Sequence, residues 1–294
     1  MQTILPVYDI EQFHYLGKTA DIYVNTWQEH FKQHEFILKP HKHNFFFIFL
    51  CTKGTGTHRI DFMDYDVTPG SVFLICPGKA HSWTLSPDAD GYIFFHTRSF
   101  FNLNASGVSL LDFPFYCSLY NDPFIMLEGR DRAITESLFH DILNEYRNDN
   151  LMKFQRIGAL LDLLYIDFTR LYLPDSKRKV QNQNFLSSRR RFESLIDKHF
   201  KKIKSAGEYA DLLHLSEKHL NRICKETINK TATEMIIERT MVEAKRILVF
   251  TKASVSQVSE NVGYADMHYF SRLFKKKCGL TPLEFRKMYN SGAN

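Results

Sequence analysis

The chain has 294 residues, five cysteines without C-x-x-C spacing and a net charge of +5. It has no run of about 18 uncharged apolar residues, which argues against a membrane span, and its N-terminus lacks the features of a signal peptide. An odd number of scattered cysteines argues against a disulfide framework or structural zinc, so we expect a cytoplasmic protein. Residues 177–294 hold 24 Lys and Arg against 12 Asp and Glu, whereas the remainder holds 14 against 21. The basic part therefore predicts a polyanionic partner.

Residues 20–100 have the pattern of short strands separated by Gly and Pro turns. A buried-strand run covers residues 45–50, an alternating pattern covers 57–62, and further strand patterns cover 71–75 and 92–95. Regularly spaced short strands are typical of an antiparallel sandwich or barrel. We expect an antiparallel β-barrel or a double-sheet jelly roll, within a two-domain α+β protein.

Two amphipathic helices are predicted between residues 131 and 172, because apolar residues recur there at helical spacing. Their short connection implies an antiparallel pair, which either forms a homodimer interface or packs only on the barrel. Pro174 ends the second helix, and the polar stretch 175–190 is expected to be a linker. The predicted domains are thus 1–174 and 191–294.

The C-terminal part is expected to be all-helical, with helix starts marked by capping residues. Capping-box patterns satisfy the unpaired backbone groups at a helix start, and single N-cap residues do so in part. The four box patterns begin at Ser205, Thr231, Ser254 and Thr281, and the two further N-cap candidates are Ser216 and Asp266.

These helices contain a repeat. Aligning Ser216 with Asp266 also aligns Leu212 with Val262, at an offset of 50 residues. Each copy reads as a short helix, a tight turn and a longer basic helix, which is the layout of a helix-turn-helix motif. Residues 233–249 form a helical strut of about 25 Å between the copies. We predict two reading helices in successive major grooves of DNA; an interaction domain with a solvated basic face is the alternative.

Three segments resemble AraC/XylS-type transcription regulators. They are G-Y-x-D-x-x-Y-F-S-R-x-F-K-K at 263–276, G-x-T-P-x-x-F-R at 279–286 and L-S-x-x-H-L-N-R at 215–222. The resemblance covers residues 188–289 and implies a DNA-binding regulator rather than an enzyme. Arg suits guanine and Asn suits adenine, while Met267 contacts a thymine methyl or nothing. The implied DNA-binding residues are Lys218, Asn221, Arg222, Met267, His268, Ser271 and Arg272.

Two short segments of the N-terminal part resemble the motifs of a cupin. They are H-K-H at 41–43 with a following Gly54, and the stretch from Gly70 to P-G-K-A-H at 77–81. Regulators of this family often carry such a domain as an effector sensor. Metal-dependent cupins have a Glu ligand near the position that Phe47 occupies in this chain. His58 or His96 could take the place of that ligand, but their positions in the sequence do not require it. We therefore expect no metal and no cofactor, with the histidines serving as polar wall residues.

The interior of this domain is either a plain core or an effector pocket, and the resemblance favours a pocket. Its expected lining is His41, His43, Phe45, Phe47, Phe73, His81 and Trp83. Aromatic walls suit a sugar, an acyl chain or a planar aromatic acid.

The sequence thus predicts a transcription regulator that binds double-stranded DNA, responds to a small-molecule effector, and forms a homodimer through residues 131–172. An activator would also contact RNA polymerase. Two alternatives stay open. One is a regulator without an effector, controlled by abundance or a protein partner. The other is a metal-dependent cupin enzyme fused to a DNA-binding domain.

Overall fold

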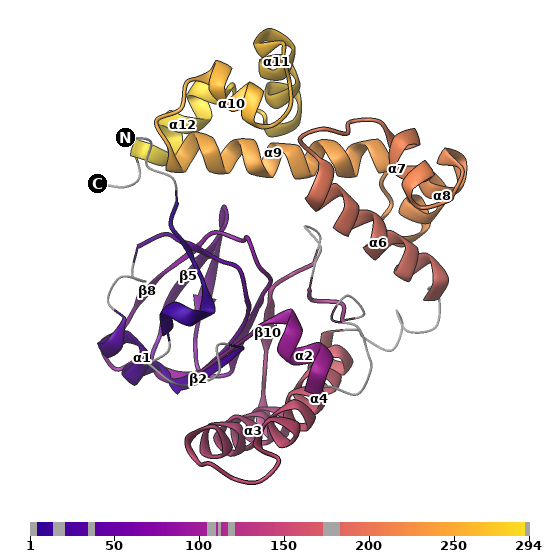
Figure 1. Cartoon of the computed structure of the whole chain (residues 1–294). Helices are drawn as coiled ribbons and strands as arrows, with labels where there is room; N and C mark the ends of the chain where they lie inside the picture. The colour runs from indigo at the N-terminus through magenta and orange to yellow at the C-terminus, as the bar shows by residue number, and fades with distance from the viewer. Residues whose placement is uncertain are drawn as a thin grey trace. The chain divides into compact units, whose positions relative to one another are not determined.

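The computed structural model divides into two units, one mainly of residues 6–175 and the other mainly of residues 176–294 (Figure 1). No helix within the described part of the chain is both long and apolar enough to cross a membrane. The structure describes residues 5–13, 21–34, 39–104, 110, 113–116, 121–172 and 183–291.

The N-terminal unit is built on two antiparallel sheets and a small parallel pair. The five-stranded sheet has the order β10-β7-β4-β9-β2, the three-stranded sheet has the order β6-β5-β8, and β1 pairs with β3. The strands are β1 (Val7–Tyr8), β2 (Ile22–Thr26), β3 (Lys42–His43), β4 (Phe46–Lys53), β5 (Gly56–Ile60), β6 (Met63–Val67), β7 (Ser71–Ile75), β8 (His81–Leu85), β9 (Asp90–His96) and β10 (Phe124–Met126).

The expected antiparallel β-domain is confirmed, and it takes the form of two facing sheets, since the described strands do not join into one closed hydrogen-bonded ring. Alternate side chains of a strand point to opposite faces, so Phe47 and Phe49 of β4 enter the space between the sheets. Phe49 meets Trp83 of β8 with ring centroids 5.3 Å apart, and Phe73 meets His58 of β5 at 4.5 Å. Aromatic packing across the sheets holds them as a sandwich.

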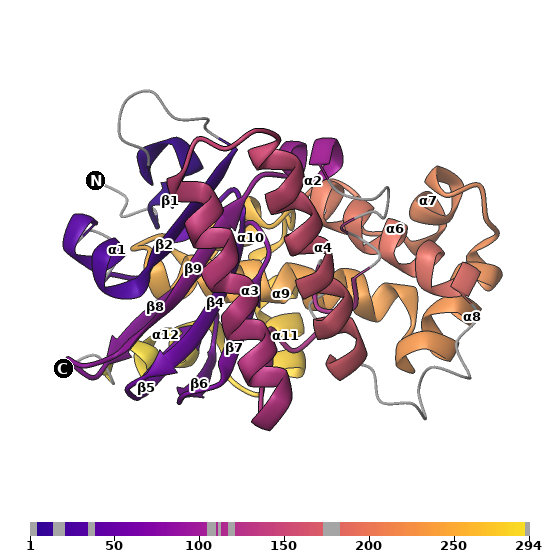
Figure 2. The same cartoon turned by 90° about the horizontal axis from the view of Figure 1, so that it is seen from below.

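Helices cover the outer face of the five-stranded sheet, where α3 and α4 run side by side (Figure 2). Phe139 of α3 stacks on Tyr92 of β9 with centroids 5.6 Å apart. The predicted pair is confirmed, because α3 and α4 are joined by a short connection as the polar stretch indicated. The helical segments of this unit are the 3-10 turn η1 (Ile10–Phe13), α1 (Trp27–Gln33), α2 (Arg98–Asn104), α3 (Gly129–Arg147) and α4 (Lys153–Tyr172).

The C-terminal unit is all-helical and is organised around α9. At the start of α9, the side-chain carbonyl of Asn221 accepts a hydrogen bond from the Ala232 N–H at 3.0 Å. At its end, the Arg286 guanidinium donates to the Leu248 carbonyl at 2.9 Å. The helices are α6 (Gln183–His199), α7 (Ala206–Leu212), α8 (Glu217–Ile228), α9 (Ala232–Phe250), α10 (Val255–Asn261), α11 (Met267–Cys278) and α12 (Pro282–Ser291).

Two expectations about this unit change. Helix α6 begins at Gln183, so residues 183–190 are helical rather than part of a linker, and residues 175–182 lie outside the described residues. The polar residues of this segment suggested a linker, but Arg189 is buried and donates to Glu193, which lies one turn later in the helix. The capping boxes at Thr231 and Ser254 form, whereas the one expected at Ser205 is wrong, because its side chain makes no capping bond.

Candidate nucleic-acid interface and histidine-lined cavity

Each half of the C-terminal unit holds a short helix, a turn and a longer helix. In the first copy α7 leads to α8, where the Ser216 hydroxyl accepts a hydrogen bond from the His219 N–H at 3.2 Å. In the second copy α10 leads to α11, where the Asp266 carboxylate accepts from the N–H groups of His268 and Tyr269 at 2.7 and 3.1 Å. These bonds lower the pKa of Asp266. Both longer helices thus begin at side chains that satisfy their first backbone donors.

The two copies differ by one residue in the turn. The left-handed residues His214 (φ 56°) and Gly263 (φ 85°) occupy the same position, 49 residues apart. Because α8 and α11 start 50 residues apart, the second turn carries one extra residue, Ala265. The pairing of Leu212 with Val262 is therefore wrong: Leu213 is buried like Val262, whereas Leu212 is 46% exposed.

The outward face of α8 carries two exposed predicted residues, Lys218 and Arg222. The Arg222 guanidinium lies 5.2 Å from the Phe185 ring of α6 and 3.2 Å from the His219 Nδ1. Asn221 is half-buried, and its bond to Ala232 already engages its carbonyl oxygen. Asn221 therefore joins α8 to α9, which leaves its amide nitrogen and one lone pair of its carbonyl oxygen for a base.

The equivalent face of α11 exposes His268 and Arg272, while Met267 and Ser271 are half-buried. Tyr269 is also 49% exposed there and contacts Tyr264 at 5.8 Å between centroids. Sequence reasoning missed Tyr269 as a surface residue of this helix, although it aligns with His219 at the same offset as the two N-caps. The structure thus places all seven predicted residues on the two longer helices.

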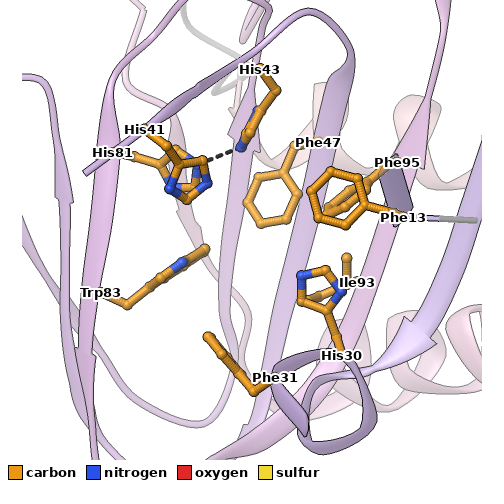
Figure 3. Close-up of a pocket in the computed structure, with 10 residues that line it drawn as sticks. All are labelled: Phe13, His30, Phe31, His41, His43, Phe47, His81, Trp83, Ile93 and Phe95. Carbon is orange, nitrogen blue, oxygen red and sulfur yellow. Dashed lines mark hydrogen bonds between the residues drawn. The ribbon is translucent and has the colours of Figure 1, made fainter. Parts of the chain in front are cut away.

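The predicted pocket residues of the N-terminal unit do not enclose a large space. His41, His43, Phe47, His81 and Trp83 line one cavity of about 10 Å³, which is room for about one water molecule (Figure 3). Phe45 and Phe73 are fully buried in the surrounding core rather than on its wall. The remaining wall residues are Phe13, His30, Phe31, Ile93 and Phe95.

The histidines at one end of this cavity form a hydrogen-bonded group. His81 Nε2 lies 2.5 Å from His43 Nε2 (Figure 3). His81 Nδ1 lies 3.0 Å from His58 Nε2. Burial, followed by the neighbouring imidazoles, lowers the pKa of His43, His58 and His81 well below the usual range. Burial also lowers the pKa of His41. The group is therefore neutral at neutral pH and offers lone pairs.

A larger, open groove lies beside this cavity. Its volume is about 390 Å³, within the range of small-molecule sites. Phe31 and Trp83 line both spaces, so these two rings form the boundary between them. Sequence reasoning missed the groove because four of its nine wall residues come from α1, in a region where strands were expected. The wall is Trp27, Gln28, Phe31, Lys32, Trp83, Leu85, Ser86, Pro87 and Ala89.

Comparison with protein families gives a match on each unit. Residues 26–98 match the AraC-like ligand binding domain, and residues 209–288 match a helix-turn-helix domain. The uncharacterized HTH-type transcriptional regulator YfiF of Bacillus subtilis is 22% identical, over 92% of this chain and 85% of that protein. The arabinose operon regulatory protein of Escherichia coli is 25% identical, over 85% and 83%.

Two further similarities cover most of the chain. The HTH-type transcriptional activator RhaR of Yersinia pseudotuberculosis is 22% identical over 85% of this chain and 84% of that protein. Among solved structures, ToxT from Vibrio cholerae matches with a TM-score of 0.42 at 13% identity, over 91% of this chain and 98% of that one.

Proposed function

We infer that this chain, which is a DNA-binding transcription regulator of the AraC type with that family's ligand-binding domain, reads its promoter with α8 and α11. The observation that carries this proposal is the repeated face of Lys218 and Arg222 on α8 and of His268 and Arg272 on α11, each directly behind an N-capped turn. Helix α9, at 19 residues, spans about 28 Å, close to one helical turn of DNA.

The test is a titration of the full chain against a fluorescent promoter fragment with two direct half-sites. Arg222→Ala and Arg272→Ala should each weaken specific binding about 5- to 150-fold, and each should relax the base preference of one half-site. The matched control is Arg130→Ala, which removes one exposed positive charge from the N-terminal unit. Unchanged specific affinity in both reading-helix variants would refute the placement of the interface.

We further propose that the effector binds in the groove beside α1 rather than in the histidine-lined cavity. The groove has the volume for a small organic molecule, and the partly exposed rings of Phe31 and Trp83 offer aromatic faces to a planar or acyl group. A thermal-shift screen of metabolites tests this, because a ligand of the native state raises the melting temperature with its occupancy. The stabilisation should disappear in Phe31→Ala; silence across a broad library would favour control by abundance or by a protein partner.

Dimerisation is proposed through the α3–α4 pair with a second copy of the chain. Ile134 of α3 and Leu163, Ile166 and Leu171 of α4 are between 39% and 49% exposed, which leaves apolar side chains on the outside of the pair. A two-fold interface there would double the number of DNA contacts. As an activator the protein would also contact RNA polymerase, and its DNA target places its action in the cytoplasm of a bacterial cell.

The effector signal is proposed to reach the reading helices through α6, the first helix after residues 173–182. Phe185, in its first turn, packs on Arg222 and lies 5.6 Å from the His219 ring. A change at the start of α6 therefore alters the rotamers available to Arg222. Such a change shifts DNA affinity only if the effector binds one arrangement better than the other.

A further inference from the structure

One ammonium group in the C-terminal unit lies at the ends of two helices. Lys204 stands in the segment between α6 and α7, and its side chain donates to the Phe200 carbonyl at 2.5 Å and to the Val262 carbonyl at 2.6 Å. Phe200 comes directly after α6, and Val262 is the C-cap of α10. Carbonyl groups at the end of a helix lack a donor within the helix and carry partial negative charge, so the cation stabilises both ends.

The same ammonium contacts the turn of the second helix-turn-helix motif. It lies 4.5 Å from the centroid of the Tyr264 ring, which is a cation–π distance. The Tyr264 ring lies in turn 5.8 Å from Tyr269 and 6.0 Å from Phe270, both in the first turn of α11. Tyr269 is exposed, whereas Phe270 is buried in the core. Lys204 is therefore linked through one ring to the start of the second reading helix.

The first motif has no corresponding link in its turn. Leu213 is the C-cap there, as Val262 is in the second motif, and no side chain of the described residues donates to the Leu213 carbonyl. Helix α6 instead contacts the first motif on the reading helix itself, where Phe185 packs on Arg222. A change at Lys204 should therefore act on the second motif and spare the first.

We propose that Lys204 is a positioning residue for DNA reading by α11, and that binding at the half-site of α11 requires its amine to be charged. This inference rests on the proposed function of α8 and α11. A neutral amine keeps donor N–H groups but loses the charge that strengthens its bonds to the two carbonyls and to the Tyr264 ring. Burial lowers the pKa of Lys204 to about 8, so about nine amines in ten are charged at pH 7 and about one in ten at pH 9.

The surroundings of Lys204 make its own charge the one that matters at this site. Lys204 forms no ion pair with the described residues, and burial is the cause of its lowered pKa. From the turn it faces Tyr264, whose pKa burial raises to about 12. From α9 the Arg239 guanidinium lies 4.3 Å from the Phe200 ring, pairs with carboxylates of α6 and α9, and keeps its charge. The other charged or titratable side chains of the adjoining segments are His199, Lys201, Lys202, Glu260 and Tyr269.

The experiment measures the affinity of the full chain for promoter fragments in which one half-site at a time is replaced by unrelated sequence. The half-site whose base preference Arg272→Ala relaxes is that of α11. Lys204→Met keeps an unbranched stem and removes the charge. It should weaken binding to the fragment with the α11 half-site at least about fivefold at pH 7 and leave the other fragment within about twofold. The matched control Lys202→Met removes an exposed positive charge from the same segment and should bind both fragments as wild type does.

The pH profile supplies a readout that a loss of packing would not change. Between pH 7 and pH 9 the wild type should lose up to about tenfold in affinity for the α11 fragment relative to the α8 fragment, because only the charged fraction is competent. Lys204→Met should show no such relative loss, since every other titrating group is common to both proteins.

Circular dichroism establishes whether Lys204→Met is folded. The proposal is overturned if the folded variant binds the α11 fragment as wild type does, or loses equal affinity for both fragments. It is also overturned if the wild type has the same pH profile on both fragments, and this measurement decides if the variant does not fold. If Arg272→Ala loses affinity and Lys204→Met does not, the role of Lys204 fails alone; if neither loses affinity, the placement of the reading helices fails as well.

Discussion

Acid should destabilise the N-terminal unit through His96, because this ring is fully buried and its burial disfavours the charged form. Its Nδ1 lies 3.0 Å from the Thr97 carbonyl and therefore carries the proton, so its Nε2 accepts from the Tyr165 hydroxyl. Tyr165 lies in turn 2.9 Å from the Tyr116 hydroxyl. Burial lowers the pKa of His96 from 6.5 to about 4. Below pH 6.5 His96 therefore binds a proton in the unfolded chain but stays neutral in the folded chain until the pH nears 4.

The sign and size follow from proton linkage. Above about pH 6.5 both states are neutral at this site, and stability does not change with pH; as pH falls toward about 4, stability is lost. Between about pH 7 and pH 5 the two pKa values give a loss of about 2 kcal/mol from His96 alone. The depressed pKa values of the other buried histidines add to the loss in the wild type.

Urea unfolding of the full chain at several pH values, with a chelator present, measures this effect. Tryptophan fluorescence reports the N-terminal unit specifically, because Trp27 and Trp83 are the only tryptophans of the sequence. His96→Gln should lose about 2 kcal/mol less than wild type between pH 7 and pH 5, whatever its stability at pH 7. His140→Gln, at an exposed position, should follow the wild type. The reasoning would be refuted if the free energy of unfolding fell by the same amount between pH 7 and pH 5 in wild type and in His96→Gln.

Three further changes test the turn, the dimer and the connection to α6. Gly263→Ala should cost at least about 2 kcal/mol in urea unfolding, because a Cβ would lie 1.8 Å from the Lys201 carbonyl oxygen at a left-handed φ. Gly279→Ala is the control: it has left-handed φ but open space, and should cost about 1 kcal/mol. Leu163→Asp should convert a dimer to a monomer in sedimentation; an unchanged mass would exclude α4 as the interface. Phe185→Ala should change promoter affinity at least threefold without loss of helix content. If the affinity equals that of wild type, the contact between α6 and Arg222 does not influence DNA binding.

The elements with strong periodicity were predictable from the sequence. The pattern at residues 71–75 coincides with β7, and the strut predicted at 233–249 differs from α9 by one residue at each end. Closure of the sheet was not predictable, because strand patterns fix which side chains face inward but not which strands pair. The helix α1 was missed for a related reason: its seven residues stand between strands and include too few turns for a clear period.

For the site residues too, local sequence predicts some features, whereas others depend on tertiary contacts. Residue types marked the reading helices, since Lys and Arg at helical spacing stay exposed in the fold. The role of Asn221 depends on a bond to Ala232, which lies 11 residues away, and no local pattern reveals it. The cavity was expected from its aromatic and histidine residues, but its volume depends on how rings from two sheets interleave. Phe47 and Trp83 approach to 5.7 Å between ring centroids, and the space left within the lining is only about 10 Å³.

Helix α6 contacts the first reading motif, and the segment that follows α6 contacts the second. Its first turn holds Phe185 against Arg222 of α8. Beyond its last turn, the Lys204 ammonium donates to the Phe200 and Val262 carbonyls at 2.5 and 2.6 Å, and it lies 4.5 Å from the Tyr264 ring in the turn before α11. Burial lowers the pKa of Lys204 to about 8, so the ammonium is still the main form at neutral pH. The second turn is thereby bound to the segment that follows α6, and Gly263 is required there because the Lys201 carbonyl occupies the space of a Cβ. A displacement of α6 would thus be transmitted to α8 through the cation–π contact of Arg222 with Phe185. It would reach the turn before α11 through the Lys204 side chain, which donates to the Val262 carbonyl. A single cation–π contact gives way more easily than this charged hydrogen bond, which makes α8 the more easily altered of the two reading helices.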